Sequence, residues 1–266
     1  MAVVATVIPT FRRPQPLVEA IRSVLAQKVD VEIVVVDDSP EQSAREAVAS
    51  LDAREVTYLP NPAPTGGWPS RVRNLGWPRT SAPFLHFLDD DDLVPEGHYL
   101  RALEAMRRHP DAGVIFGRIA PFGDSESLEH EVRFFNDSAG RARRCARFGP
   151  RWAFAAEQLF NSPLLVCSAS LARRSVVERI EGFDPLVRLA EDVDYHARAF
   201  RAGGAAFIEE TTLHYRISAS SLMHSNHDLT QVQASYTHMF RRYQRTWGRA
   251  DFTALKLFAR TVLKAV

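Results

Sequence analysis

The chain has 266 residues, of which 45% are hydrophobic and 24% charged, and its formal net charge is +1. This is the composition of an ordinary globular protein, and the balanced charge gives no sign of nucleic-acid binding. The two cysteines, Cys145 and Cys167, have no metal-type spacing and do not form a disulfide framework, so we expect a reducing, cytoplasmic setting. No run approaches the roughly 20 apolar residues of a membrane helix, and the apolar start is expected to be a strand rather than a signal peptide.

The first half of the chain alternates apolar, β-branched runs with amphipathic stretches. The runs predict buried strands at 3–8, 31–36, 56–59, 84–88 and 112–116. Helices are predicted between them at 14–27, 41–51, 71–77 and 95–109, and a Pro- and Gly-rich loop at 60–70. Strands separated by helices of this length form parallel βαβ units. The fold class is therefore α/β, with a Rossmann-like, mostly parallel central sheet flanked by helices.

The second half is less regular. Residues 118–150 are polar and Arg-rich and are expected to loop over the site. The remaining patterns predict a strand at 163–171, a turn at 182–185, and helices at 173–180, 190–202, 228–247 and 251–265. We divide the chain into a ligand-binding half at 1–117, a second half of the same domain at 118–225, and a C-terminal helical extension at 226–266.

Four consecutive aspartates, Asp89 to Asp92, follow the predicted strand at 84–88. Neighbouring carboxylates repel one another, and Mg²⁺ or Mn²⁺ bound together with a phosphate-bearing ligand would neutralise them. In an extended segment alternate side chains share a face, so Asp89 and Asp91 would point together. Capping of the next helix explains one or two aspartates but not four. The run therefore predicts a metal and phosphate site.

Other polar residues also follow predicted strands. Thr10 follows the first strand, and Asp37 and Asp38 follow the second. The carboxyl ends of parallel strands share one edge of a sheet, where ligands bind, so we expect these residues to converge on the aspartate run. A carboxylate at a strand end commonly accepts hydrogen bonds from a nucleoside, but Asp37-Asp38 could equally form an Asx turn.

Several further groups have both a functional and a structural interpretation. Arg71, Arg73 and Asn74 suit a phosphate or a base edge but could form a solvated helix face. Glu191 and Asp192 open a helix, where acids are ordinary first-turn residues, although either could act as a general base.

Histidines and the C-terminal segment are open in the same way. His214 and His224 could ligate a metal, although a lone histidine is more often structural. The last 40 residues form a basic amphipathic pattern that suits a homodimer face, a lid, peripheral contact with an anionic membrane, or simple packing on the domain.

The chain resembles the inverting glycosyltransferases of family 2, which have the GT-A fold. Five segments carry the resemblance, in order: Thr6-Val7-Ile8-Pro9-Thr10-Phe11-Arg12-Arg13, Val34-Val35-Val36-Asp37-Asp38-Ser39, Arg73-Asn74-Leu75-Gly76, Phe87-Leu88-Asp89-Asp90-Asp91-Asp92, and Gly182-Phe183-Asp184 followed by Glu191-Asp192-Val193-Asp194. The loop 61–70 lacks the family's usual Asn-x-Gly spacing, and Ser218 stands where a histidine is often found. Pro95 lies one position closer to the aspartates than in many members, so the Asp-x-Asp register is either 89/91 or 90/92.

The resemblance implies roles for particular residues. It implies that Asp192 is the catalytic base, that Asp91 ligates Mn²⁺ or Mg²⁺, and that Glu191 and His214 are accessory. The residues it assigns to the nucleotide-sugar are Pro9, Thr10, Arg12, Asp38, Arg73, Asp89 and Asp90.

The implied reaction moves a sugar, with inversion, from a nucleotide-diphosphate donor, most simply a UDP-sugar, to the hydroxyl of a glycan, lipid-linked or small-molecule acceptor. Two other functions stay open. A metal-dependent nucleotidyltransferase would more often show an early Gly-rich phosphate loop and lysine, and neither is present. A noncatalytic sugar-nucleotide-binding protein would not need the Glu191-Asp192 pair. We expect a cytoplasmic protein that can lie at the inner membrane face.

Overall fold

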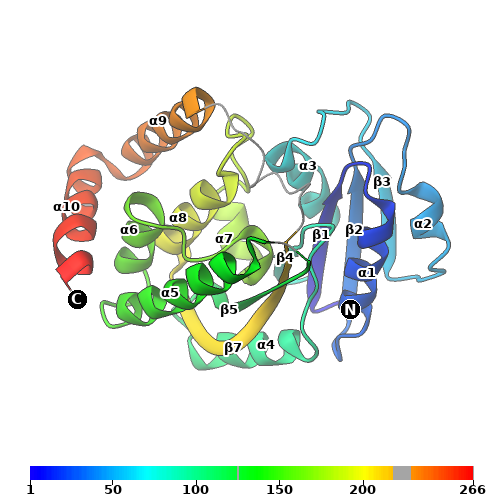
Figure 1. Cartoon of the computed structure of the whole chain (residues 1–266), viewed down its shortest axis with the longest axis horizontal. Helices are drawn as coiled ribbons and strands as arrows, with labels where there is room; N and C mark the ends of the chain where they lie inside the picture. Colours follow the sequence, from blue (N-terminus) through cyan, green and yellow to red (C-terminus); the bar gives the residue numbers. More distant parts are fainter. Residues whose placement is uncertain (125, 218–228, 266) are drawn as a thin grey trace.

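The structure is a computed structural model that describes residues 1–124, 126–217 and 229–265. Within those residues seven strands form one sheet in the order β3-β2-β1-β4-β6-β5-β7, flanked by helices (Figure 1). The strands are β1 (Val4–Thr10), β2 (Val31–Asp37), β3 (Val56–Pro60), β4 (Phe84–Phe87), β5 (Val114–Phe122), β6 (Ser170–Arg173) and β7 (Ala205–Arg216).

The first four strands are parallel, as the sequence predicts, and their carboxyl ends lie in register. Thr10 of β1 is opposite Asp37 of β2, which is opposite Pro60 of β3. These strands are apolar runs because helices cover them, as is usual for parallel sheets. The helices of this half are α1 (Pro14–Leu25), α2 (Arg45–Ala49), α3 (Pro69–Gly76) and α4 (His98–Arg108), followed by β5. The predicted mostly parallel α/β fold is confirmed.

The prediction that residues 118–150 form a loop is wrong. Strand β5 continues to Phe122, through the expected boundary at 117, and α5 (Leu128–Ala146) is a 19-residue helix. Helix α5 buries Phe135, Ala139 and Ala142 on one face, at helical spacing. The pattern is hard to recognise because several of its buried residues are small and many arginines surround them.

The prediction of a strand at 163–171 is also wrong over most of that range. Residues 163–166 are irregular, Cys167–Ala169 form a 3₁₀ turn, η2, and β6 starts at Ser170. Strand β6 runs antiparallel to both neighbours, β4 and β5. Strand β6, from the second half of the chain, lies between β4 and β5, which follow one another in the sequence. The two halves of the chain therefore share one sheet.

The sequence analysis missed two elements, α6 (Trp152–Phe160) and β7. Helix α6 is almost entirely buried and so lacks amphipathic contrast. Strand β7 carries Glu209, Glu210, Thr211 and Thr212 in its middle, and its pairing with β5 is irregular beyond Phe116. Helices α7 (Arg174–Arg179) and α8 (Glu191–Gly203) lie where helices were expected.

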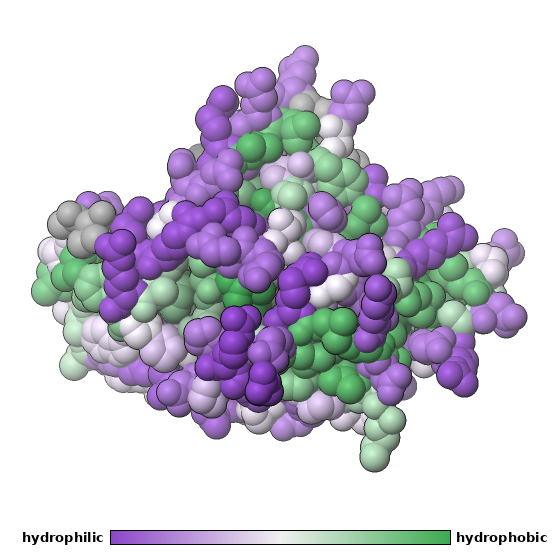
Figure 2. All heavy atoms as spheres, turned by 90° about the horizontal axis from the view of Figure 1, so that it is seen from below, coloured by the Kyte–Doolittle hydropathy of each residue, from purple (hydrophilic) through white to green (hydrophobic). Residues whose placement is uncertain are grey.

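Two helices, α9 (Leu229–Trp247) and α10 (Arg249–Ala265), form the orange and red end of the molecule in Figure 1. Helix α10 buries Phe252, Leu255, Ala259 and Leu263. It therefore packs on the domain, which is one of the alternatives that the sequence left open for this segment. None of the helices in the described ranges combines the length and the apolar character needed to cross a bilayer. Seen from below, the hydrophobic areas of the surface are separate and interrupted by hydrophilic side chains (Figure 2).

Candidate active site at the carboxyl edge of the sheet

The polar groups that follow β1, β2 and β4 meet at one edge of the sheet, as predicted. The Thr10 hydroxyl donates a hydrogen bond to Asp90 Oδ2 at 2.7 Å, and the Asp38 N–H donates to the Thr10 carbonyl at 2.9 Å. Thr10 therefore joins the aspartate run to the end of β2, although the three segments are far apart in the chain.

Two of the four aspartates share one arginine that the sequence analysis did not select. Arg13 Nη1 lies 2.7 Å from Asp91 Oδ2 and 3.4 Å from Asp90 Oδ1. Arg12, which the resemblance assigned to the nucleotide-sugar, turns its side chain outward to Glu41 at 2.7 Å, and its contact with the nucleotide-sugar stays a prediction. Arg12 has a left-handed backbone, with φ of +59°, at the turn that follows β1. The arginine that reaches the aspartates is therefore one position later in the chain.

The other two aspartates are tied to the second half of the chain. The Asp89 N–H donates to Ser168 Oγ at 3.0 Å, and the Asp89 carboxylate accepts from Arg73 Nη2 at 2.5 Å. Asp92 is fully buried and its Oδ1 accepts the Arg216 N–H at 3.0 Å. Asp92 Oδ2 is buried without a hydrogen-bond partner among the described residues.

Burial divides the aspartates by alternation. The side chains of Asp89 and Asp91 are 32% and 17% exposed, whereas that of Asp90 is 8% exposed and Asp92 is buried. The run is not extended as the sequence analysis expected: Asp90 and Asp91 form a turn, in which the Asp92 N–H donates to the Asp89 carbonyl at 3.2 Å. The alternation in exposure favours the 89/91 register of the Asp-x-Asp pattern.

Burial and mutual repulsion make these carboxylates hard to ionise. Loss of hydration, followed by the negative charge of Asp91, raises the pKa of Asp90 to about 7. Burial also raises the pKa of Asp91 and of Asp92, with the charge of Asp89 as the next cause. A cation beside the run would favour the ionised form of all of them.

The carboxylates of the aspartate run suit a divalent cation such as Mg²⁺, whose other ligands would be substrate phosphates and water. Carboxylate oxygens are the ligands that Mg²⁺ prefers, and it is usually held by one or two of them together with substrate phosphates and water. In the described part of the chain, no three His, Cys, Asp or Glu side chains form a ready-made metal cluster. The outward-facing Asp91 is consistent with that mode of binding.

Arg73 lies at the centre of the edge. It is only 3% exposed, and it bridges Asp89 and Glu191, whose Oε1 lies 2.8 Å from Arg73 Nη1. Its position depends on Gly76 at the end of α3, where an added Cβ would lie 2.5 Å from Val7 Cγ1 and 2.9 Å from Val36 Cγ2. The glycine lets α3 approach β1 and β2 closely enough for Arg73 to reach both acids.

Asp38 holds its own loop. Its carboxylate accepts hydrogen bonds from Asn61 Nδ2, from the Thr65 N–H and hydroxyl, and from the Gly67 N–H. The Asx-turn interpretation applies to Asp37, which accepts from the Ser39 N–H at 2.9 Å. Asp38 therefore shapes the loop 61–67 beside the site, and its contact with a nucleotide stays a prediction.

Among the described residues, neither Pro9 nor His214 forms a hydrogen bond or an ion pair with the aspartates. Pro9 is part of β1 opposite Val36. His214 lies in β7, where its backbone pairs with Leu93 and its ring packs edge-to-face on Phe122. His224 and Ser218 lie outside the described residues. His214 as an accessory group stays a prediction.

Asp192 opens α8 beside Glu191 and Arg73. Its Oδ1 accepts the Val193 N–H at 2.8 Å, and burial, followed by the negative charge of Glu191, raises its pKa to about 7. Arg73 acts in the opposite direction and lowers it. A carboxyl group that titrates near neutral pH in a partly enclosed site is suited to general-base catalysis.

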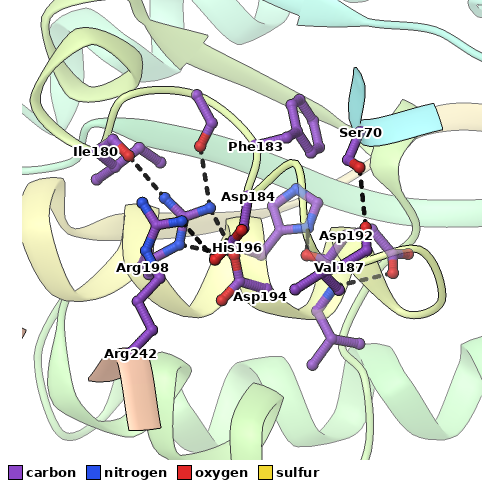
Figure 3. A network of polar contacts seen from close by, with 12 residues as sticks. Ser70, Ile180, Phe183, Asp184, Val187, Asp192, Asp194, His196, Arg198 and Arg242 are labelled. Carbon is purple, nitrogen blue, oxygen red and sulfur yellow. Dashed lines mark hydrogen bonds and ion pairs between the residues drawn. The ribbon is translucent and has the colours of Figure 1, made fainter. Parts of the chain in front are cut away.

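The segment before Asp192 is pinned by polar contacts that the sequence analysis missed (Figure 3). The carboxylate of Asp184 pairs with Arg242 at 2.6 Å. It also accepts a hydrogen bond from His238 at 2.9 Å, and both partners lie in α9. Arg198 donates to the carbonyl groups of Ile180 and Gly182. No local pattern distinguishes these arginines from surface arginines, because their partners lie 16 to 58 positions away in the chain.

The carbonyl of Val187 accepts two further hydrogen bonds. Ser70 Oγ donates to it at 2.8 Å and Trp68 Nε1 at 3.3 Å. Both donors lie at the start of α3, the helix that carries Arg73. The loop before α8 is therefore fixed relative to the same helix that links Asp89 and Glu191.

Comparison with known proteins adds three findings. The family model described as glycosyl transferase family 2 matches residues 6–181. A β-1,3-glucosyltransferase of Campylobacter jejuni, named for GalNAc(5)-diNAcBac-PP-undecaprenol, is 34% identical over 122 residues, which are 44% of this chain and 38% of that protein. The minor teichoic acid biosynthesis protein GgaB of Bacillus subtilis is 23% identical over 80% of this chain and 23% of its own length. The chain thus spans well under half the length of these two relatives.

Solved structures share the fold. Staphylococcus aureus TarS 1–349 in complex with UDP-GlcNAc superposes with a TM-score of 0.64 at 16% identity, over 89% of this chain and 66% of that one. The mannosyltransferase PcManGT from Pyrobaculum calidifontis, in complex with GDP-Man and Mn²⁺, gives a TM-score of 0.59 at 13% identity, over 98% of this chain and 76% of that one.

Proposed function

The chain belongs to glycosyl transferase family 2 and has the GT-A fold, and from this premise we propose that it transfers a sugar from a nucleotide-diphosphate donor, with inversion, to an acceptor hydroxyl. The observation that carries the proposal is the Arg73 bridge. The Arg73 side chain contacts both Asp89 and Glu191. Asp89 belongs to the run proposed to face the phosphates, and Glu191 is next to the candidate base Asp192. Family membership gives no support to the nucleotidyltransferase alternative.

The roles follow from the surroundings of each group. Asp192 takes the proton of the acceptor hydroxyl as that oxygen attacks the anomeric carbon. Attack comes from the face opposite the leaving diphosphate, which inverts the centre. Arg73 orients Asp89 and Glu191, and Asp38 shapes the loop at the nucleotide side. Asp91 would hold the divalent metal, which supplies Lewis-acid neutralisation of the diphosphate when bound.

The donor, acceptor and location are proposed from the relatives. A uridine donor is supported by the structural neighbour that holds UDP-GlcNAc, although another neighbour holds GDP-Man. The named lipid-linked and teichoic acid relatives support a glycan or lipid-linked acceptor. A cytoplasmic protein at the inner membrane face, with contact or homodimerisation through α9 and α10, stays a prediction.

A panel of nucleotide sugars with Mn²⁺ tests the proposed function. The true donor should raise the melting temperature most, because stabilisation follows RT ln(1 + [L]/Kd). Release of free nucleoside diphosphate on addition of candidate acceptors then separates an enzyme from a noncatalytic binding protein. If no nucleotide sugar stabilises the protein, the proposed function is wrong.

Asp91→Asn should weaken nucleotide-diphosphate binding in the presence of Mn²⁺ by about 10-fold or more, because removing a carboxylate ligand costs on the order of 1.4 kcal/mol or more of affinity. Binding without metal should change little. Isothermal titration calorimetry with and without Mn²⁺ measures both quantities. Asp52→Asn, on the surface after α2, is the control. Equal Mn²⁺-dependent affinity in Asp91→Asn and wild type would show that Asp91 is not a ligand.

The rate should rise with pH and level off above about pH 7, because Asp192 has a raised pKa of about 7 and acts as a base only when ionised. Glu191→Gln should move this midpoint to lower pH. Glu191 raises the Asp192 pKa, and its loss also leaves Arg73 free to lower it. The pH dependence of kcat/KM for both proteins measures the shift. A midpoint that moves upward would contradict this electrostatic arrangement.

A further inference from the structure

Five arginines on the acceptor side of the site are exposed and have no acidic partner. Among the described residues, no Asp or Glu forms a salt bridge with any of them, whereas some exposed arginines elsewhere, such as Arg143 with Glu209, are paired. The five lie on α3, on the loop before α8, and at the junction of α9 and α10. They are Arg71, Arg188, Arg241, Arg245 and Arg249, and we call them the arginine strip.

The two ends of the strip meet at Pro185 and Leu186. Arg71 donates from Nε to the Pro185 carbonyl at 3.1 Å and stacks on Trp68, 3.9 Å from the ring centroid. Arg188 lies over the same ring at 5.5 Å. Leu186, the residue after Pro185, lines a hollow of about 520 Å³. The other residues of that hollow are His238, Arg241, Gln244, Arg245 and Arg249.

The acid nearest to the hollow does not cancel this charge. Asp184 is buried and already pairs with both His238 and Arg242. Its ionised form is strongly favoured: although burial opposes ionisation, the hydrogen bonds from Arg242, the Leu186 N–H and His238 lower its pKa to about 2. The local balance of charge therefore stays positive at neutral pH.

The strip also leads to the proposed base. The loop 185–190 joins the hollow to Glu191 and Asp192, and Ser70 and Trp68 hold that loop through the Val187 carbonyl. A ligand lying along the strip would therefore extend away from Asp192 on the side from which the acceptor must approach.

We propose that the strip binds an acceptor that carries several phosphate groups, such as a phosphodiester-linked glycan. The guanidinium fork matches phosphate oxygens with two parallel hydrogen bonds, and repeated phosphates match repeated arginines. This inference rests on the proposed function, because it names the acceptor of the same site.

The side chains of the strip suit a soluble polyanion better than a bilayer. Among the described residues that lie beside the strip, Leu186 is the one large apolar side chain that is strongly exposed, at 65%. The Trp68 ring is stacked by arginines, and its N–H is already donated to a carbonyl, so it is not free to insert into lipid. Interfacial binding requires a buried apolar face as well as positive charge.

Binding of inorganic polyphosphate, measured by calorimetry in EDTA, tests the inference. EDTA prevents polyphosphate from binding through a metal at the aspartates. The triple variant R241Q/R245Q/R249Q should bind about 10- to 100-fold more weakly than wild type, because each exposed ion contact contributes about twofold to fivefold. Its binding should also depend less steeply on salt. The control R22Q/R79Q/R147Q removes three exposed arginines elsewhere and should bind as wild type does.

Three outcomes would overturn the inference. They are equal loss of binding in the control variant, equal affinity of wild type for a polyuronate of the same charge, and strip-dependent binding to phosphatidylserine vesicles without strip-dependent binding to polyphosphate. Donor-induced stabilisation should be the same in both triple variants. Failure of polyphosphate binding with normal donor stabilisation would therefore reject the acceptor class and leave the proposed transfer intact.

Discussion

Replacing Asp192 with Asn is expected to lower kcat by about 10²- to 10⁴-fold, the usual contribution of a general base. Asn occupies nearly the same volume and can still accept the Val193 N–H, so the start of α8 should keep its structure. It cannot take a proton from the acceptor hydroxyl. Donor affinity should change little, because Asp192 acts on the acceptor. Steady-state kinetics and donor calorimetry on the same preparation measure the two effects.

The same variant offers a second readout. The part of the rise in rate that comes from ionisation of Asp192 should disappear in Asp192→Asn, because that carboxyl group has been removed. Asp194→Asn, two positions along α8, instead breaks a buried pair with Arg198 at 2.6 Å and should affect stability. Near-normal turnover of Asp192→Asn would mean that another group is the base.

Arg73→Met should destabilise the protein by about 3 kcal/mol, at the low end of the range for breaking a buried ion pair, because Asp89 is partly exposed. Methionine keeps most of the apolar volume but leaves Asp89 and Glu191 without their cation. The two acids should then repel and move apart, so transfer should also be lost. Urea denaturation followed by circular dichroism measures the change in the free energy of unfolding.

The matched comparison is Arg107→Met, which removes an exposed arginine paired with Glu104 within α4. Surface pairs of this kind contribute about 0.2–1 kcal/mol. If both variants lost the same stability, the bridge between Asp89 and Glu191 would have no special structural importance.

The elements predicted well from the sequence are those with one dominant local signal. Strands β1 and β2 are mostly apolar runs rich in valine, and α1 has a clear apolar stripe. Elements whose signal is masked were missed or misplaced. Helix α5 buries small residues between arginines, α6 is buried all round, and β7 has acidic residues in its middle. Their stability comes from tertiary packing, which local patterns do not report.

The candidate site shows the same division. The convergence of Thr10 with the aspartate run follows from parallel topology, and it could be predicted without any contact information. The choice between Arg12 and Arg13 could not, because it depends on one left-handed residue at the turn. The contacts of Ser168 and Arg216 could not be predicted either. Ser168 lies in the turn η2, where a strand was predicted, and Arg216 lies in β7, which was missed.

The placement of β6 between β4 and β5 has a consequence for how the protein is made. The aspartate run is secured only when Ser168 and Arg216 arrive, and Asp92 and Arg216 are 124 positions apart. At about 5–20 residues per second, a ribosome needs roughly 6–25 s to add those residues. During that interval β4 has no neighbour on its outer side until β6 is made, and Asp92 lacks the hydrogen bond from the Arg216 N–H. We expect the nascent chain to gain affinity for nucleotide only after residue 216 has emerged.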